Sequence, residues 1–411
     1  VLAGQEFEVR IAYENQGKED FSGLVLRLEP PASFTLKRTA PALDEESGWR
    51  LGNLRTGSRG EVVLWGTLIG GEGTIGELRV SVEAAFGTER YRIAENRATI
   101  TIAASPVHLE ISGGAAGEAV RLGDMLVYTI QYENKTDVSL RDAVISAALR
   151  GAMFDFSTLQ TRAAFRSIDN TLTWNAANTP ELALVVPKAR GEVSFTLRSK
   201  VAYPVRRFGD RDFTLAVDAE FSSPTVPPLL AAEKTIAVAR DEQKVAGDIA
   251  IEASALFRDA ASGVANAGPW PLRVNQPTQF TVHWKLRAYA GEMNGVEVRA
   301  SLGGNVRLVR VVRIDALTAP KYNERTQEVV WRIERIAANR GVLDAPVEAI
   351  FQIELTPSSL AVGSTAPLMG KTTAIAADGF SGIALSAEYQ ELTTALPDDL
   401  TVRSGEGVVR P

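Results

Sequence analysis

The chain contains no cysteine and only two histidines among its 411 residues. The missing thiols exclude disulfide bonds, thiolate metal sites and cysteine nucleophiles. Small secreted domains often depend on disulfides, but a domain of about 100 residues can be held together by its core alone. The lack of cysteine is therefore compatible with a prokaryotic surface as well as with the cytosol.

Long apolar runs and an excess of basic residues are also missing. No stretch reaches the roughly 18 apolar residues that cross a bilayer as a helix. The sequence opens on Val1 without a signal peptide or a starting methionine, so we expect a fragment or a processed product. Any membrane anchor would then lie outside these residues. The formal net charge of −6 argues against nucleic acid as a partner, because phosphate binding needs a basic face.

What the sequence does contain is one strand pattern in three copies. Residues 4–15 read GQEFEVRIAYEN, residues 123–134 read GDMLVYTIQYEN, and residues 275–286 read NQPTQFTVHWKL. In each copy apolar and polar residues alternate with a period of two. Such alternation is typical of an antiparallel strand with one face on a core and the other in water.

Each copy is followed by a lone tryptophan, and then by a turn that leads into another alternating strand. The tryptophans are Trp49, Trp174 and Trp331. The turns are Gly60-Glu61-Val62, Gly191-Glu192-Val193 and, in the third copy, Pro346-Val347-Glu348. One tryptophan at the same phase in every unit is what a core needs, so we expect these three side chains to be buried.

Many short strands with turn signals between them, and no convincing amphipathic helix, predict an all-β fold. We expect three tandem immunoglobulin-like antiparallel β-sandwich domains in an elongated array. The domains comprise residues 1–104, 105–242 and 243–394, and an extended C-terminal tail follows over residues 395–411. Residues 157–166 alone suggest a short helical turn. Because the linkers are short, the domains should lie end to end in a rod on the order of 100 Å long.

The three units are unequal at their start. Alternating strands over residues 107–111 and 249–253 precede the second and third copies, but nothing equivalent precedes the first. The first domain should therefore lack its first strand, while residues 395–411 are a surplus. Either the tail packs on its own third domain, or it is donated as a strand to the first domain of another copy, which would build a head-to-tail fibre.

The sequence contains no residues that we expect to be catalytic, cofactor-binding or metal-ligating, so we expect the protein not to be an enzyme. His108 and His283 lie on strands of different domains without a nucleophile motif. His283 is out of phase with its apolar neighbours, so we expect it on the solvent face. Acidic loop residues such as Asp398 and Asp399 lack the spacing of a calcium loop and should be solvated. Trp270, between two prolines, is the best candidate for an exposed contact residue.

The Tyr-Glu-Asn strand, the later tryptophan and the Gly-Glu-Val strand together resemble the "domain of unknown function eleven" repeats of bacterial and archaeal cell-surface proteins. Residues 126–134 and 172–175 of the second unit carry the resemblance best, and it is weak in the third unit, where residues 284–286 read Trp-Lys-Leu. The resemblance covers the second unit and most of the first. Its motifs specify a fold rather than a chemistry.

The resemblance implies a non-enzymatic extracellular protein, structural or adhesive, that forms part of a longer stalk, surface layer or fibre. Its partners would be other surface proteins or copies of itself. Two alternatives stay open on the sequence. One is an extracellular module that binds carbohydrate or protein through loops at one end of a sandwich, and the other is an accessory region of a larger secreted enzyme.

Overall fold

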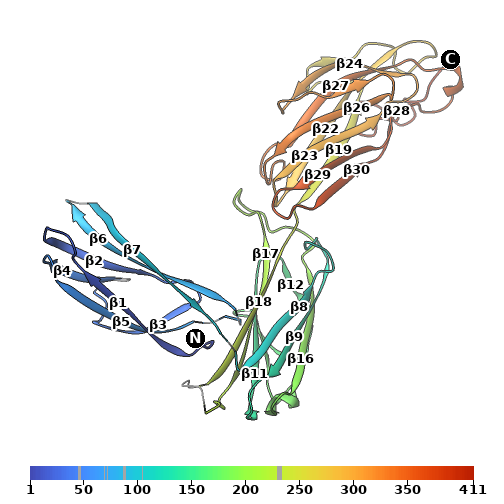
Figure 1. The fold of residues 1–411 in the computed structure, drawn as a ribbon. Helices are drawn as coiled ribbons and strands as arrows, with labels where there is room; N and C mark the ends of the chain where they lie inside the picture. The colour runs from blue at the N-terminus through green and yellow to red at the C-terminus, as the bar shows by residue number, and fades with distance from the viewer. Residues whose placement is uncertain (45–47, 69, 72, 87–88, 104, 229–233) are drawn as a thin grey trace.

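The computed structural model describes residues 1–411 apart from 45–47, 69, 72, 87, 88, 104 and 229–233. The described residues form antiparallel strands grouped into three sandwiches, which confirms the predicted all-β fold (Figure 1). Two short 3-10 helices, η1 (Pro180–Ala183) and η2 (Ser359–Ala361), are the only helical elements within that part of the chain.

The first domain has a three-stranded sheet in the order β1-β5-β3 and a four-stranded sheet in the order β4-β2-β6-β7. Its strands are β1 (Glu6–Glu14), β2 (Phe21–Glu29), β3 (Phe34–Ala40), β4 (Gly48–Leu54), β5 (Arg59–Leu68), β6 (Ile75–Phe86) and β7 (Glu89–Thr101). No described strand pairs with the outer edge of β1. Among the described residues, β1 is therefore an edge strand of its sheet.

The second domain pairs a sheet β12-β16-β9-β8 with a sheet β13-β14-β11-β17-β18, and a small pair β10-β15 lies beside them. Its strands are β8 (Val107–Gly114), β9 (Met125–Asn134), β10 (Leu140–Arg141), β11 (Val144–Arg150), β12 (Phe154–Thr161), β13 (Ala164–Arg166), β14 (Thr171–Trp174), β15 (Leu184–Val185), β16 (Arg190–Ser199), β17 (Thr214–Ser223) and β18 (Thr235–Lys244). The helical turn expected over residues 157–166 is wrong, because this backbone pairs with β16 and β14.

The third domain pairs a sheet β19-β22-β27-β24 with a sheet β25-β26-β23-β29-β30, and the short pairs β20-β21 and β28-β31 lie outside them. Its strands are β19 (Asp248–Leu256), β20 (Arg258–Asp259), β21 (Val264–Ala265), β22 (Thr278–Tyr289), β23 (Met293–Ser301), β24 (Val306–Ile314), β25 (Lys321–Asn323), β26 (Glu328–Ile336), β27 (Val347–Leu355), β28 (Pro367–Met369), β29 (Thr372–Asp378), β30 (Ala384–Tyr389) and β31 (Leu392–Thr393). The predicted boundary at residue 242 falls inside β18, which runs on to Lys244.

The C-terminal segment, residues 395–411, is a compact run of turns rather than the extended tail expected. Its side chains Leu396 and Val409 are buried in the core of the third domain. The backbone N–H of Arg410 donates to the carbonyl of Leu272 at 2.8 Å, and Val409 bridges Val362. The segment therefore packs on its own domain, which was the first of the two alternatives.

The three tryptophans that recur at one phase are core residues, as predicted. Trp49, Trp174 and Trp331 are each at most 1% exposed. Their indole rings fill the space between the two sheets of each domain, where burial of a large aromatic side chain contributes most.

The Gly-Glu-Val motif exists because a tyrosine ring lies across its glycine. Tyr13 is the cross-strand partner of Gly60, and Tyr132 is the partner of Gly191. A side-chain carbon on either glycine would overlap the tyrosine hydroxyl. Two motifs that are distant in the sequence are therefore two halves of one contact.

The asparagine of the Tyr-Glu-Asn triplet ties down the loop that follows it. Asn134 is fully buried, and its side-chain nitrogen donates to the carbonyls of Val138 at 2.8 Å and Val185 at 2.9 Å. Its side-chain oxygen accepts from the backbone of Thr136 at 3.0 Å. Asn15 makes the same three kinds of bond in the first domain. The triplet is a structural unit, as its place at a strand end suggested.

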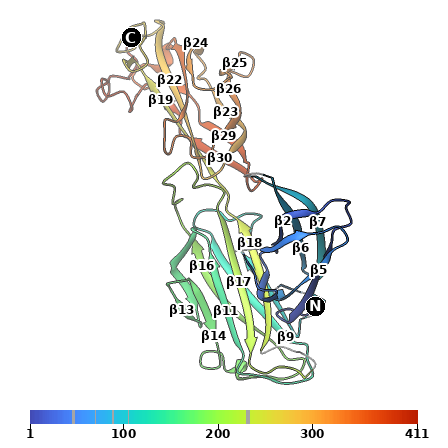
Figure 2. The same ribbon diagram turned by 90° about the vertical axis from the view of Figure 1, so that its left-hand side faces the viewer.

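The second and third domains lie end to end, but the first is set at an angle beside the second (Figures 1 and 2). The prediction of a straight rod of three domains is therefore wrong. The turn at Gly4 lies against the start of β18, where a side-chain carbon on Gly4 would be 3.6 Å from Cδ1 of Ile236. This lateral contact directs the first domain away from the common axis of the other two.

Replacing Gly191 by alanine should destabilise the second domain by about 1–3 kcal/mol, because the new methyl group displaces the ring of Tyr132. Gly209→Ala is the matched control, since nothing lies within 4 Å of a side-chain carbon there. Hydrogen exchange of β9 and β16 in increasing urea measures both variants. Equal stability of the two variants would contradict the role given to the glycine.

Candidate functional site

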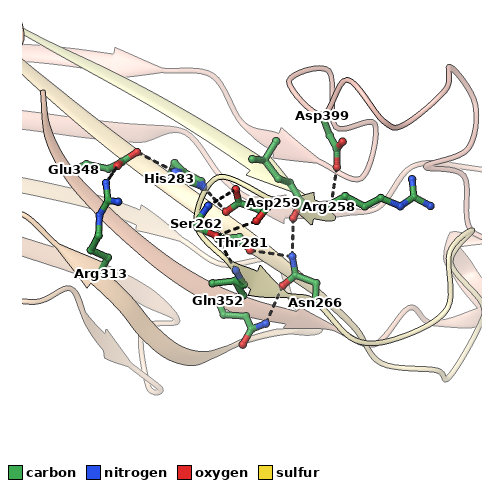
Figure 3. Close-up of polar contacts among 12 residues, drawn as sticks. Arg258, Asp259, Ser262, Asn266, Thr281, His283, Arg313, Glu348, Gln352 and Asp399 are labelled. Carbon is green, nitrogen blue, oxygen red and sulfur yellow. Dashed lines mark hydrogen bonds and ion pairs between the residues drawn. The ribbon is translucent and has the colours of Figure 1, made fainter. Parts of the chain in front are cut away.

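A cluster of buried polar side chains lies in the third domain, where the hairpin β20-β21 folds over β22 and β27 (Figure 3). His283 of β22 is at its centre. Its Nε2 lies 2.8 Å from Oδ2 of Asp259, and its Nδ1 lies 3.0 Å from Oε1 of Glu348. All three residues are less than 10% exposed.

The expectation that His283 faces solvent is wrong. The strand does place it opposite Val282 and Trp284, on the outer face of its sheet, as the alternation indicates. That face is not open to water, because the hairpin that carries Asp259 covers it (Figure 3). An alternating pattern identifies the two faces of a strand but not what covers each of them.

The two carboxylates of the cluster are surrounded by nitrogen atoms that can donate hydrogen bonds to them. An ionised carboxylate only accepts hydrogen bonds, so a ring N–H of His283 that faces Asp259 or Glu348 is the donor. Arg313 also pairs with Glu348, and Nζ of Lys285 lies 3.7 Å from the same carboxylate. Buried ions need such partners, because removal from water is costly for each of them.

The carboxyl of Asp259 stays ionised despite its burial. Burial by itself opposes ionisation, but hydrogen bonds from Ser262 and His283 outweigh it, and the pKa of Asp259 is lowered. The backbone N–H of Ser262 is 3.2 Å from Oδ1 of Asp259. The hairpin therefore stabilises the charge that attaches it to the sheet.

Amide side chains extend the cluster toward the C-terminal segment. Asn266 donates to Oγ1 of Thr281 at 2.9 Å and to the carbonyl of Phe257 at 3.0 Å. Gln352 donates to Oδ1 of Asn266 at 2.8 Å. These bonds join the hairpin to both central strands of the sheet.

Asp399 anchors the other side of the hairpin, and the prediction that it is solvated is wrong. It is 3% exposed, and its Oδ2 accepts from the backbone of Phe257 and of Arg258, both at 2.9 Å. Burial opposes its ionisation, yet bonds from Arg258 and Thr401 keep its pKa lowered. The C-terminal segment is thereby held to the hairpin by an ionised side chain.

The geometry of the cluster indicates a structural role, in which it joins the hairpin β20-β21 to the sheet, rather than a catalytic one. Both ring nitrogens of His283 already face carboxylates, so neither is free to take a proton from a substrate. The hydroxyl of Ser262 donates to the carbonyl of Asp259 and not to the ring. Within the described part of the chain, no group of three or more histidine or acidic side chains is arranged to hold a metal ion.

The other residues singled out in the sequence lie elsewhere. Trp270 is partly buried: its ring stacks on Phe257 at 4.8 Å between centroids, and its Nε1 is 3.4 Å from Oε2 of Glu406. Its role as a contact residue stays a prediction. His108 is exposed on β8 of the second domain, with Nε2 at 3.4 Å from Oε2 of Glu110. The two histidines are not brought together.

A second buried polar feature, which the sequence did not reveal, joins the second and third domains. Asn339 is fully buried and donates to the carbonyl of Asp210 at 3.0 Å, across the joint. The backbone of Asp212 donates to the carbonyl of Ala290 at 2.8 Å. Lys244 donates to the carbonyl of Phe380 at 2.8 Å.

The linker of this joint, residues 245–247, is itself buried. Val245 and Ala246 are at most 2% exposed, and Tyr203 donates to the carbonyl of Ala246 at 2.8 Å. A side-chain carbon on Gly247 would lie 2.7 Å from the carbonyl oxygen of Tyr289. The joint is therefore packed like a core and not like a flexible linker.

No helix of the described residues is long and apolar enough to span a membrane. No family model and no curated protein matches the chain, so the resemblance to the cell-surface repeats stays a prediction.

Solved structures similar to this chain include two streptococcal domains and a pilin. The first is the C-terminal domain of the antigen I/II-family protein AspA of Streptococcus pyogenes, at 8% identity over 70% of this chain and 99% of that one, with a TM-score of 0.30. The second is the C-terminal domain of the antigen I/II polypeptide BspA of Streptococcus agalactiae, at 8% identity over 69% of this chain and 99% of that one, with a TM-score of 0.27. The third is the full-length major pilin SpaD of Corynebacterium diphtheriae, at 12% identity over 59% of this chain and 68% of that one, with a TM-score of 0.25. At such identities the similarity concerns the fold alone.

His283→Ala should destabilise the third domain by about 1–3 kcal/mol, because the buried carboxyls of Asp259 and Glu348 lose a hydrogen-bond partner that lies between them. His108→Ala is the matched control and should change stability by less than about 0.5 kcal/mol, since that side chain is exposed. Urea unfolding followed by hydrogen exchange measures both variants, on β22 for His283→Ala and on β8 and β9 for His108→Ala. A His283→Ala variant as stable as the control would show that the cluster does not hold the hairpin.

The third domain should also lose stability in acid. The pKa values of Asp259 and Asp399 are lowered in the folded state, so their contribution is complete above the pKa of the unfolded carboxyl and is lost as pH falls. The loss should begin near pH 4, where an unfolded aspartate titrates at about 3.9. Thermal unfolding between pH 2 and 6 measures it, and Asp399→Asn should flatten the slope. An unchanged slope in that variant contradicts the assignment.

Proposed function

We propose that the chain is a structural element of a cell-surface protein, structural or adhesive and non-enzymatic, that holds another part at a set distance from the envelope. The observation that carries the proposal is the buried joint between the second and third domains. Its partners would be other surface proteins or copies of itself. Its location would be extracellular.

The joint supports a mechanical role because bending it is costly. Rotation of one domain against the other would expose Val245 and Ala246 and separate Asn339 from Asp210. A buried polar group that loses its partner costs about 1–3 kcal/mol. Two sandwiches joined in this way move as one stiff unit, about twice the length of a single domain.

The polar cluster of the third domain fits the same role. Its charged side chains bond to one another and to the backbone of the hairpin and the C-terminal segment. Asp259 and Asp399 thus fasten the parts of the domain that no long strand holds. This arrangement resists unfolding of the hairpin and of residues 395–411, which a load-bearing element requires.

Spin labels on the second and third domains test the stiffness. The chain has no cysteine, so Ile168→Cys and Leu317→Cys, at positions that are 90% and 102% exposed, give a single labelled pair. Double electron–electron resonance should give one narrow distance peak, and Asn339→Ala should broaden it. The control pair, Ile168→Cys with Val201→Cys inside the second domain, should stay narrow in both backgrounds.

A broad distance distribution across the unmodified joint would contradict the spacer role. The location is tested separately, by protease treatment of intact source cells followed by mass spectrometry. Peptides of residues 1–411 should be released from cells whose cytoplasmic proteins stay intact, and retention of these residues inside the cell would refute the extracellular assignment.

A further inference from the structure

The first domain has an open edge at the place where the other two domains carry a strand. In the second domain β8 pairs with β9, and in the third β19 pairs with β22. The equivalent strand of the first domain is β1, which pairs with β5 on one side only among the described residues. A row of backbone N–H and C=O groups on β1 is thus available for another strand.

Behind this edge lies a groove of about 630 Å³ between the two sheets. Its walls are largely aliphatic. The residues nearest the open edge come from β1, β6 and β7 and include Val9, Ile11, Val80, Val82 and Ile93, while leucines of β2, β4 and β5 line the rest of the groove. Charged residues of both signs stand at its rim, among them Glu95 and Arg97 of β7. An apolar slot with a polar rim next to a free strand edge is suited to a peptide strand with alternating side chains.

Equivalent apolar residues of β9 and β1 differ in how deeply they are buried. Leu126, Tyr128 and Ile130 of β9 are 0% exposed. Their counterparts in the first copy of the pattern, Phe7, Val9 and Ile11, are only partly buried. The same apolar pattern therefore closes a core in one domain and leaves it open in the other.

Strand β7, on the opposite wall of the groove, is also more exposed than an edge strand of a closed sandwich. Every residue from 91 to 99 is exposed, although alternate side chains of a strand at a sandwich edge should point inward. Ile93, which lines the groove, is 42% exposed. In the second domain the corresponding edge strand β18 is in contact with β8.

The second domain also indicates how an added strand would lie. There β8 runs antiparallel to β9, with Leu109 opposite Tyr132 and Ile111 opposite Ile130. Val107 and Leu109 are buried between the sheets. Transferred to the first domain, the same register places aliphatic side chains opposite Tyr13 and Ile11.

We propose that this groove binds an extended strand of a partner polypeptide, antiparallel to β1, with aliphatic side chains at alternate positions entering between β1 and β7. The C-terminal segment of another copy is not the donor. Its apolar side chains Leu396 and Val409 are already buried in the third domain. The proposal rests on the first domain alone and does not depend on the spacer role of the other two.

A peptide with the sequence of residues 105–116, which contains β8, is the probe. Labelled with fluorescein and titrated with the full chain, it should bind with one-to-one stoichiometry in fluorescence anisotropy. Hydrogen exchange should show new protection confined to β1 and to β7. A peptide carrying V107S, L109S and I111S should bind at least tenfold more weakly.

Variants of the chain locate the site. Ile93→Gln should weaken peptide binding at least tenfold, and because this side chain is already partly exposed the domain should stay folded, which hydrogen exchange of β2 checks. Ile75→Gln is the matched control: Ile75 is 66% exposed and lies outside the groove, so binding should be unchanged.

Three results would overturn the proposal. The first is no binding and no protection of β1 at millimolar peptide. The second is concentration-dependent association of the chain alone with protection of β1, which would assign the edge to a second copy. The third is protection of β1 in the intact natural protein without any partner, which would assign the groove to a segment of the same polypeptide.

Discussion

A sandwich of two sheets is dry inside only if the gap along each edge between the sheets is covered. In the second and third domains one strand does this by pairing with an edge strand of one sheet and contacting the edge of the other. β8 pairs with β9 and contacts β17 and β18, and β19 pairs with β22 and contacts β29 and β30. The complete burial of the apolar side chains of β9, such as Leu126, Tyr128 and Ile130, depends on this pairing.

The first domain demonstrates the dependence by lacking that strand. It has the same tyrosine across the same glycine and the same asparagine anchor as the second domain. Those local contacts bring β1 and β5 together, but they leave Ile11 partly exposed and the groove open. Local motifs therefore specify the register of two strands, whereas closure of the core needs a segment that the described residues do not supply.

The third domain diverges by adding cover on the outside of its sheet. The hairpin β20-β21 and the C-terminal segment lie over a face that is open to water in a simple sandwich, and ionised side chains hold them there in addition to the buried Leu396 and Val409. Buried carboxylates require partners, and each ring nitrogen of His283 faces one of them. This added layer stabilises the hairpin and residues 395–411 against unfolding.

The sequence by itself determined the elements whose cause is local. Alternation with a period of two identified the strands, and the recurring tryptophans identified core positions. The tertiary structure decided which surfaces are covered. It buried His283 and Asp399, made residues 157–166 into strands, folded the C-terminal segment onto its own domain and turned the first domain aside. Alternation records only which side chains share a face of a strand, and what lies against that face comes from another segment of the chain, as the hairpin with Asp259 does for His283, 24 residues away.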